Sequence, residues 1–185
     1  ECLEISGSFL GPLAVGDLGE QINAVETFDL TPSSINRSVF LAQTIEPAQL
    51  RVTGEKTAGV PIEWWAIALP RSGSAQFQTR LKENPNLDYT ITDAGLSYQY
   101  AGRNVTVPSV PWISLSAYTG TTPATVTVTF SNTHVGTPLE EQGVYRAFVQ
   151  VWQKDLSNTP IESLVKFTDV TVSVGRALYI PTIRK

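Results

Sequence analysis

The chain has 185 residues, of which 42% are hydrophobic and 16% charged, and its formal net charge at pH 7 is −4. This length suits one well-buried domain, and the composition is that of a folded protein with a sparsely charged surface. The sequence has no basic stripe, which argues against nucleic-acid binding, and no apolar run long enough to span a bilayer.

The first ten residues alternate apolar and polar side chains. Leu3, Ile5 and Phe9 fall on one face of the expected strand, because successive strand residues point to opposite sides. The glycine-rich segment 11–19 then interrupts regular structure. Three interpretations stay open: the strand folds back onto its own sheet, it inserts into a neighbouring subunit as an assembly strand, or it is disordered.

Two further features bear on where the protein works. Cys2 is the only cysteine, so no internal disulfide can form, and its thiol is either unreactive or pairs with another chain. The sequence contains no methionine, even at position 1, few lysines and many Thr, Ser, Val and Ala residues. We therefore expect a secreted protein, extracellular or on the cell surface, from which a signal peptide has been removed.

The next part of the chain is expected to be mostly β-structure. Four strands are predicted, at residues 21–30, 34–41, 48–53 and 60–69. Trp64 and Trp65 are neighbours, so their indoles point to opposite faces of one strand, and one of them belongs in the core. A short helix over 75–83 is supported by Phe77 and Leu81, which are four residues apart.

A hairpin and the most regular strand of the sequence follow. Strands at 87–100 and 103–107 are expected to pair around Ala101-Gly102. After a short strand at 112–115 and a turn, apolar residues alternate strictly with threonines from Ala124 to Phe130, which predicts a strand with one buried face.

Two long strands, 143–153 and 162–174, are predicted near the end of the chain. In the second, the apolar residues change phase after Phe167, which predicts a bulge near Thr168 and Asp169.

The last ten residues form a second terminal segment with apolar residues at Leu178, Ile180 and Ile183. Pro181 restricts the expected strand to a sheet edge or a partly unpaired position. With an apolar strand expected at each end, the chain resembles a subunit that links head to tail.

About ten strands separated by turn residues, with almost no helical periodicity, predict an all-β antiparallel sandwich. Several motifs are also similar to those of BACON-type and related bacterial immunoglobulin-like domains. They are Pro111-Trp112-Ile113-Ser114-Leu115-Ser116, Gly120-Thr121-Thr122-Pro123-Ala124-Thr125-Val126-Thr127-Val128, Gly143-Val144-Tyr145, Leu30-Thr31-Pro32-Ser33-Ser34 and Ile62-Glu63-Trp64-Trp65. The resemblance implies an immunoglobulin-like sandwich over 28–175 with an insertion at about 70–110, preceded by an N-terminal strand and hinge at 1–27 and followed by a C-terminal tail at 176–185.

The sequence offers little catalytic machinery. His134 is the only histidine, and no serine lies in a nucleophile-elbow motif. One histidine and one cysteine do not make a usual zinc site. We therefore predict a non-enzymatic protein without a cofactor. Calcium bound by loop oxygens is an open alternative, with the candidates Asp17, Asp93, Asp155 and Glu140.

Two classes of function remain. The first is a structural subunit that assembles with copies of itself into a filament, tube or surface layer by exchanging terminal strands. The alternative is a carbohydrate-binding or adhesion module in which Trp64, Trp65 and Trp152 stack on sugar rings, unless these rings pack in a core or an interface. Asn36 and Asn104 each begin an N-glycan acceptor triplet.

Overall fold

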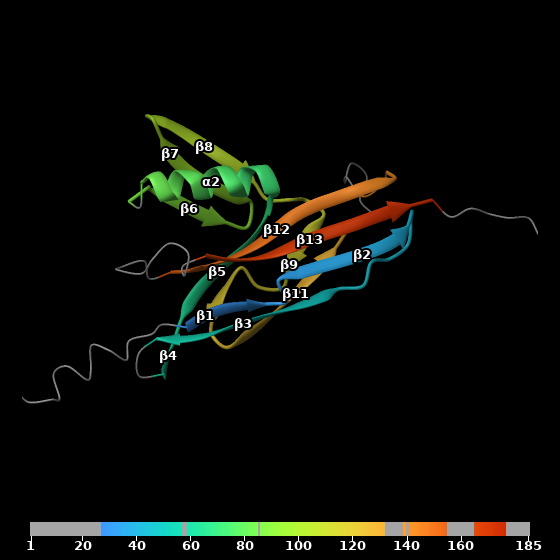
Figure 1. Cartoon of the computed structure of the whole chain (residues 1–185), viewed down its shortest axis with the longest axis horizontal. Helices are drawn as coiled ribbons and strands as arrows, with labels where there is room; N and C mark the ends of the chain where they lie inside the picture. The colour runs from blue at the N-terminus through green and yellow to red at the C-terminus, as the bar shows by residue number, and fades with distance from the viewer. Residues whose placement is uncertain are drawn as a thin grey trace, which may run out of the picture.

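The computed structural model describes residues 27–56, 59–84, 86–131, 139, 141–154 and 165–176. These residues form two facing β-sheets, with a helix and a small third sheet packed on one side (Figure 1). No helix among them is long and apolar enough to cross a membrane.

Sheet A and sheet B make the sandwich. Sheet A has the order β1 (Thr27–Thr31), β3 (Ala48–Lys56), β11 (Ala124–Phe130) and β9 (Ile113–Leu115), with β4 (Val60–Pro61) beside β3. Sheet B has the order β10 (Thr119–Thr121), β5 (Glu63–Pro70), β12 (Gly143–Gln153), β13 (Val165–Gly175) and β2 (Ser34–Phe40), and β2 runs parallel to β13. When β2, β4 and β10 are set aside, the orders β1-β3-β11-β9 and β5-β12-β13 correspond to the ABED and CFG sheets of an immunoglobulin-like sandwich, which confirms the predicted fold class.

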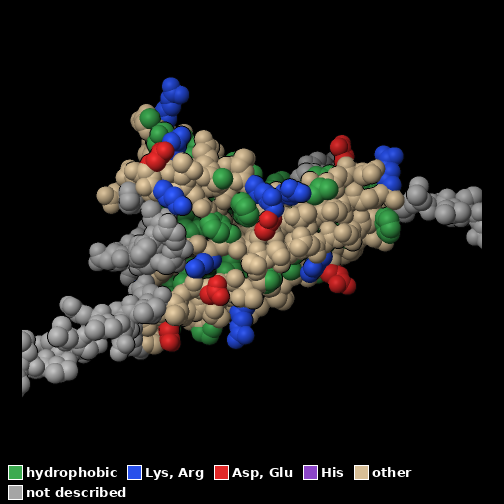
Figure 2. Space-filling view, viewed as in Figure 1, with side chains coloured by type: hydrophobic (Ala, Val, Ile, Leu, Met, Phe, Trp, Pro, Cys, Tyr) green, Lys and Arg blue, Asp and Glu red, His purple; other side chains and the backbone are tan. Residues whose placement is uncertain are grey.

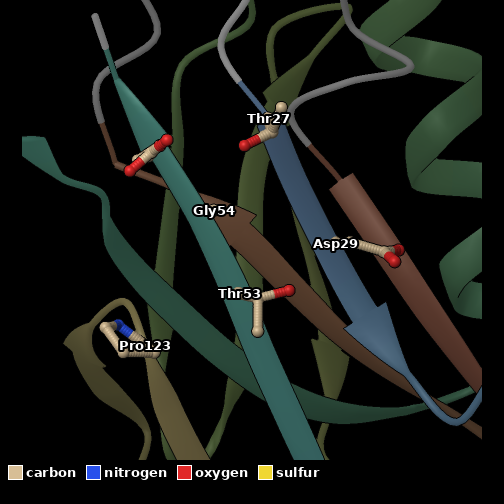
Figure 3. A pocket seen from close by; sticks show the side chains of 6 residues that line it. Thr27, Asp29, Thr53, Gly54 and Pro123 are labelled. Carbon is tan, nitrogen blue, oxygen red and sulfur yellow. The ribbon is translucent and has the colours of Figure 1, made fainter. Parts of the chain in front are cut away.

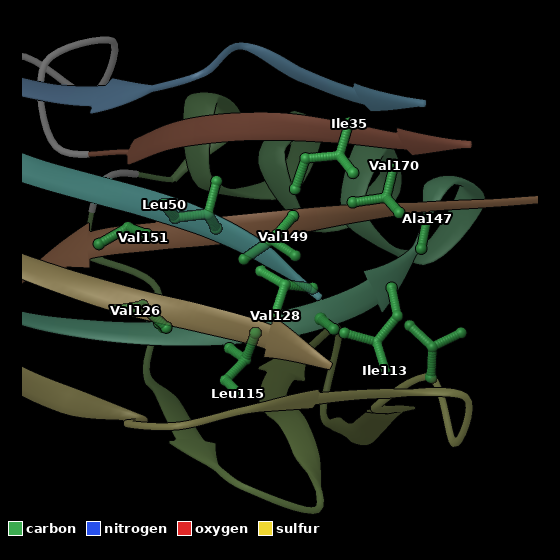
Figure 4. Packing of buried hydrophobic residues seen from close by; sticks show 14 of the residues in the cluster. Ile35, Leu50, Ile113, Leu115, Val126, Val128, Ala147, Val149, Val151 and Val170 are labelled. Carbon is green, nitrogen blue, oxygen red and sulfur yellow. The ribbon is translucent and has the colours of Figure 1, made fainter. Parts of the chain in front are cut away.

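The main core lies between sheets A and B. Alternate positions of each strand supply it, as the period of two requires. In β11 the predicted bounds are confirmed, and Val126 and Val128 are fully buried while Thr125, Thr127 and Thr129 face outward. Figure 4 shows these two side chains together with Leu50, Val149 and Val151 between the sheets.

The segment after β5 covers part of the other face of sheet B. It forms α2 (Arg71–Glu83) and sheet C, which consists of β6 (Tyr89–Thr92), β7 (Gly95–Tyr100) and β8 (Arg103–Pro108). A second core results, to which Phe77 and Leu81 contribute from α2. The predicted helix is thus confirmed, but it begins at Arg71. Its first turn was missed because Gly73 and Ser74 carry no apolar signal; Gly73 lets the helix approach Val107 closely.

The predicted bulge in β13 is wrong. Residues 165–174 pair with β12 in one uninterrupted register. The change of phase has another cause: Val165 faces the second core, whereas Val170 and Val172 face the main core. Apolar residues on both faces of a strand that is covered on both sides need no extra residue.

The predicted turn after β9 also contains a strand. Residues 119–121 pair with β5 as β10 and place Gly120 against the indole of Trp64, where an added Cβ would come within 2.5 Å of Cζ2. The predicted strand 60–69 is divided at Ile62, whose N–H donates to Thr122 Oγ1 at 2.9 Å. The turn therefore contributes to the edge of sheet B.

Replacing Gly54 with alanine tests how β1 joins sheet A. Gly54 has a φ of +143°, and an added Cβ would collide with the Thr27 carbonyl and lie 2.9 Å from Phe28 Cα. We expect Gly54→Ala to lower the free energy of unfolding by roughly 2–3 kcal/mol, measured by urea titration. Gly175→Ala is the matched control, because its added Cβ would meet nothing nearer than Phe40 Cδ1 at 3.9 Å. Equal stability of the two variants would contradict this account.

Candidate functional site

Two of the three tryptophans predicted to stack on sugars are buried. Trp64 is 1% exposed in the main core and Trp152 is 0% exposed in the second core, so neither ring face is open to a ligand and the prediction is wrong for both. Trp65 lies on the opposite face of β5 from Trp64 and is half-buried, with Lys154 Nζ 5.6 Å from its ring centroid. Lys154 Nζ also lies 3.7 Å from a carboxylate oxygen of Glu63, so the surface beside the Trp65 ring already holds an ion pair.

The other predicted site residues are distributed over the chain. Asn36 on β2 and Asn104 on β8 are exposed, on different sheets. Asp93 is exposed in the turn between β6 and β7, and no group of three acidic, histidine or cysteine residues that could hold a metal ion occurs within the described ranges. Several predictions fall outside the described residues: Cys2, Leu3, Ile5, Phe9, Asp17, His134, Glu140, Asp155, Leu178, Ile180 and Ile183.

The second core contains polar groups among packed rings. Phe77 lies 5.0–5.4 Å, centroid to centroid, from the rings of Tyr89, Tyr98 and Trp152. Gln150 donates to Ser74 Oγ from a fully buried position. Trp152 Nε1 and Tyr89 Oη are buried and form no hydrogen bond. Burial raises the pKa of Tyr89 from 10.0 to about 12, because it disfavours the phenolate.

An ion pair marks the border between the covered and the open parts of sheet B. Arg71, the first residue of α2, pairs with Asp169 of β13 and lies 5.3 Å from the ring centroid of Phe148. Phe148 in turn packs on Phe167, 5.8 Å away between centroids. Beyond this group the outer face of sheet B extends past α2 (Figure 1). The visible surface carries scattered charges of both signs and no basic stripe (Figure 2).

The described chain begins and ends at opposite ends of the molecule (Figure 1). β1 starts with Thr27 beside Glu55, and β13 ends with Gly175 beside Phe40. We call these the Thr27 end and the Phe40 end. β1, β2 and β13 all run from the Thr27 end towards the Phe40 end.

The Phe40 end carries exposed apolar side chains. Phe40 is 49% exposed, Val144 is 58% exposed and Leu41 is also exposed. Phe40 of β2 pairs with Gly175 of β13, and Val144 of β12 pairs with Ser173 on the other side of β13. Because Ser173 and Gly175 are two residues apart on one strand, the side chains of Phe40 and Val144 share the outer face of sheet B. One feature of the sequence could have indicated this surface. Val39, Phe40 and Leu41 are consecutive apolar residues, and neighbouring strand residues point to opposite faces, so at least one of them is expected to face away from the main core.

β2 forms an edge of sheet B and leaves backbone groups without partners in the described structure. The Ser33 carbonyl accepts from Asp169 N–H, and Leu41 N–H donates to Gly175, so odd-numbered residues bond to β13 and even-numbered ones face away. Gln43 Oε1 accepts from Phe40 N–H, and Arg37 donates to the carbonyls of Asn36, Glu46 and Pro47. The open groups of this edge are the N–H and C=O of Ser34 and Ser38 and the N–H of Asn36.

Two hollows lie on other surfaces. One, of about 300 Å³, opens on the outer face of sheet A beside the start of β1, and Figure 3 shows the side chains around it. The other, of about 170 Å³, lies on sheet C and is lined mainly by polar groups, including Asp88, Gln99 and Asn104. Neither contains Trp64, Trp65 or Trp152.

Comparisons with known proteins assign the chain to no family. No family model matches the chain, and no curated protein matches it. Among solved structures, it is similar to an ASH/PapD-like domain of human CEP192, with 13% identity and a TM-score of 0.46 over 82% of this chain and 87% of that one. It is also similar to the CooA pilin subunit of enterotoxigenic Escherichia coli, with 12% identity and a TM-score of 0.39 over 80% of this chain and 99% of that one. These similarities concern the β-sandwich.

Tyr89→Phe tests the second core through pH. In the unfolded chain this phenol ionises near pH 10, whereas the folded chain keeps the proton up to about pH 12. The contribution of the neutral phenol to stability is therefore complete below pH 10 and is lost as the pH rises towards 12. We expect Tyr89→Phe to be as stable as wild type at pH 7, since its hydroxyl is buried without a partner, and to lose less stability between pH 10 and 12.

The measurement is the urea midpoint at successive pH values. Tyr100→Phe, at an exposed position that stacks under Arg80, is the control and should keep the alkaline loss of the wild type. Identical alkaline profiles for wild type and Tyr89→Phe would refute the assignment.

Proposed function

We propose that this protein is a non-enzymatic extracellular subunit that assembles head to tail with copies of itself, through its terminal strands, into a filament, tube or surface layer. The Trp112 to Val128 motif then relates its sandwich to BACON-type domains of secreted bacterial proteins. The observation that carries the proposal is the placement of the two ends of the described chain at opposite ends of the molecule (Figure 1).

This placement suits a polar, open-ended assembly. Residues 1–26 precede β1 at the Thr27 end, and residues 177–185 follow Arg176 at the Phe40 end. When copies stack in one orientation, the N-terminal segment of one subunit starts beside the Phe40 end of the next. Such a head-to-tail contact joins two different surfaces, and it generates filaments when the rotation between copies does not close a ring.

The described side chains support a structural rather than a catalytic role. Three of the described carboxylates are engaged in ion pairs with basic residues: Asp169 with Arg71, Glu83 with Arg80 and Glu63 with Lys154. The few lysines and the many Thr and Ser residues support an extracellular location.

A carbohydrate-binding or adhesion module is the second candidate. It no longer rests on Trp64 and Trp152, which are buried, but on the polar hollow of sheet C. There the Asp88 carboxylate and the amides of Gln99 and Asn104 offer acceptors and donors of the kind that bind sugar hydroxyls. Glycan-array screening of the purified chain tests it, and absence of binding removes it.

Changing the apolar face of the N-terminal segment tests the assembly. The variant Leu3→Ser, Ile5→Ser, Phe9→Ser keeps the length of the chain but loses the side chains that would be buried in a neighbour. We expect ordered polymers of the wild type in negative-stain electron microscopy and only monomers of the variant by light scattering. The melting temperature should be unchanged, because the strands of the described sandwich lie between Thr27 and Gly175.

The control variant is Glu4→Gln, Ser6→Ala, Ser8→Ala, which alters the opposite face of the same segment and should still polymerise. Polymers of the triple serine variant in wild-type amounts would show that this end does not join subunits.

A further inference from the structure

The edge of β2 is the most suitable site on the described surface for an added strand. β2 has seven residues, compared with five in β1, three in β9 and β10, four in β6 and six in β8, which ends in a proline. An exposed strand edge is a template for pairing because its N–H and C=O groups are unpaired. On β2 these groups are the N–H and C=O of Ser34 and Ser38 and the N–H of Asn36, since the Asn36 carbonyl accepts from Arg37.

Resting on the proposed head-to-tail assembly, we infer that the open edge of β2 accepts residues 1–10 of a second copy of this chain, running parallel to β2. The segment matches the edge in character, because Leu3, Ile5 and Phe9 alternate with polar residues as an added strand requires. Its charges also match, since it carries Glu1 and Glu4 and the edge carries Arg37.

The length of chain outside the structure is sufficient. Residues 11–26 link the segment to Thr27, and sixteen residues span at most about 55 Å when fully extended. The seven residues of β2 cover only about 23 Å. A segment that starts from the Thr27 end of one subunit therefore reaches across the Phe40 end of the next and along the whole of β2.

The direction follows from the same geometry. β1 and β2 run from the Thr27 end to the Phe40 end. When two copies stack in this orientation, the Thr27 end of the second copy lies beside the Phe40 end of the first. The residues before Thr27 of the second copy then extend back over the Phe40 end of the first copy. Residue 10 is then nearest that end and residue 1 farthest from it, which makes the added strand parallel to β2. Phe9 lies against the exposed Phe40 and Leu41, and Cys2 lies near Ser34.

The native cysteine provides the test. We would assemble full-length Ser34→Cys, Ser38→Cys and Ser72→Cys variants under reducing conditions, remove the reductant and count disulfide-linked oligomers on a non-reducing gel. Ser72, exposed on α2, is the control position. We expect at least a fivefold higher yield from Ser34→Cys than from Ser38→Cys, background from Ser72→Cys, and loss of the product when Cys2→Ser is added.

The outcomes separate this inference from the proposed function. Polymers in which Ser34→Cys links no better than Ser72→Cys would leave head-to-tail assembly standing and overturn the β2 acceptor. A higher yield from Ser38→Cys would overturn the parallel direction. Monomers of the wild type at every concentration would overturn the proposed function itself, and this inference with it.

A second pair of variants decides the matter if Ser34→Cys does not assemble. Ser38→Pro removes an N–H that faces away from β13, so it blocks the outer edge without breaking the β2–β13 pairing. We expect at least tenfold less polymer from Ser38→Pro than from Ser38→Ala, with similar melting temperatures. Equal amounts of polymer from the two variants would overturn the inference.

Discussion

The structure depends on the burial of sheet B on both faces. In β5 and β12 neighbouring residues face different cores: Trp64 packs towards sheet A, whereas Ile67 and Trp152 pack towards α2 and sheet C. A strand covered on both sides carries near-continuous apolar residues rather than an alternating pattern. Sheet B is therefore the middle layer, with sheet A on one face and α2 with sheet C on the other, and the burial of its apolar residues holds the three layers together.

The covering of the outer face is only partial, and this leaves a surface for contacts. α2 begins at Arg71, which pairs with Asp169, and beyond this pair the outer face reaches the Phe40 end with Phe40 and Val144 exposed. The pair joins the first residue of the helix to β13, so it fixes where the cover stops. Among the described residues, sheet B thus has one part of its outer face covered by α2 and sheet C and another part that they leave uncovered.

The sequence allowed most of the sandwich to be predicted, because period-two patterns are local. The strand Ala124–Phe130 was predicted with its bounds, and Phe77 with Leu81 located the helix. Two-sided burial caused the main errors: the phase change in β13 indicated a bulge, and the apolar rings of Trp64 and Trp152 were offered as ligand platforms. Local patterns show that a residue is apolar, but not which of two layers covers it.

The candidate site could not be predicted, because it depends on which strands become edges. β2 is an edge only because it pairs with β13 from the far end of the chain, a pairing that the alternation of Ile35 and Val39 does not specify. Phe40 and Leu41 gave a signal only as neighbours of Val39 in an apolar run. Only the strand order β12-β13-β2 shows that Phe40 and Leu41 lie at the same end of the molecule as the exposed Val144.

The same edge also explains how uncontrolled pairing would be limited. Arg37 and Gln43 satisfy backbone groups of Asn36 and Phe40, so an incoming strand finds only a short open stretch. Each added backbone hydrogen bond contributes about 0.5–1.5 kcal/mol net, and a few of them do not hold two proteins together against the loss of translational freedom. In the proposed assembly, burial of Phe40 and Leu41 would add about 25 cal/mol per Å² of apolar surface. In the proposed assembly, a strand without matching apolar residues would gain only the hydrogen bonds, so the short open edge and the apolar Phe40 end would together favour the segment that fits both.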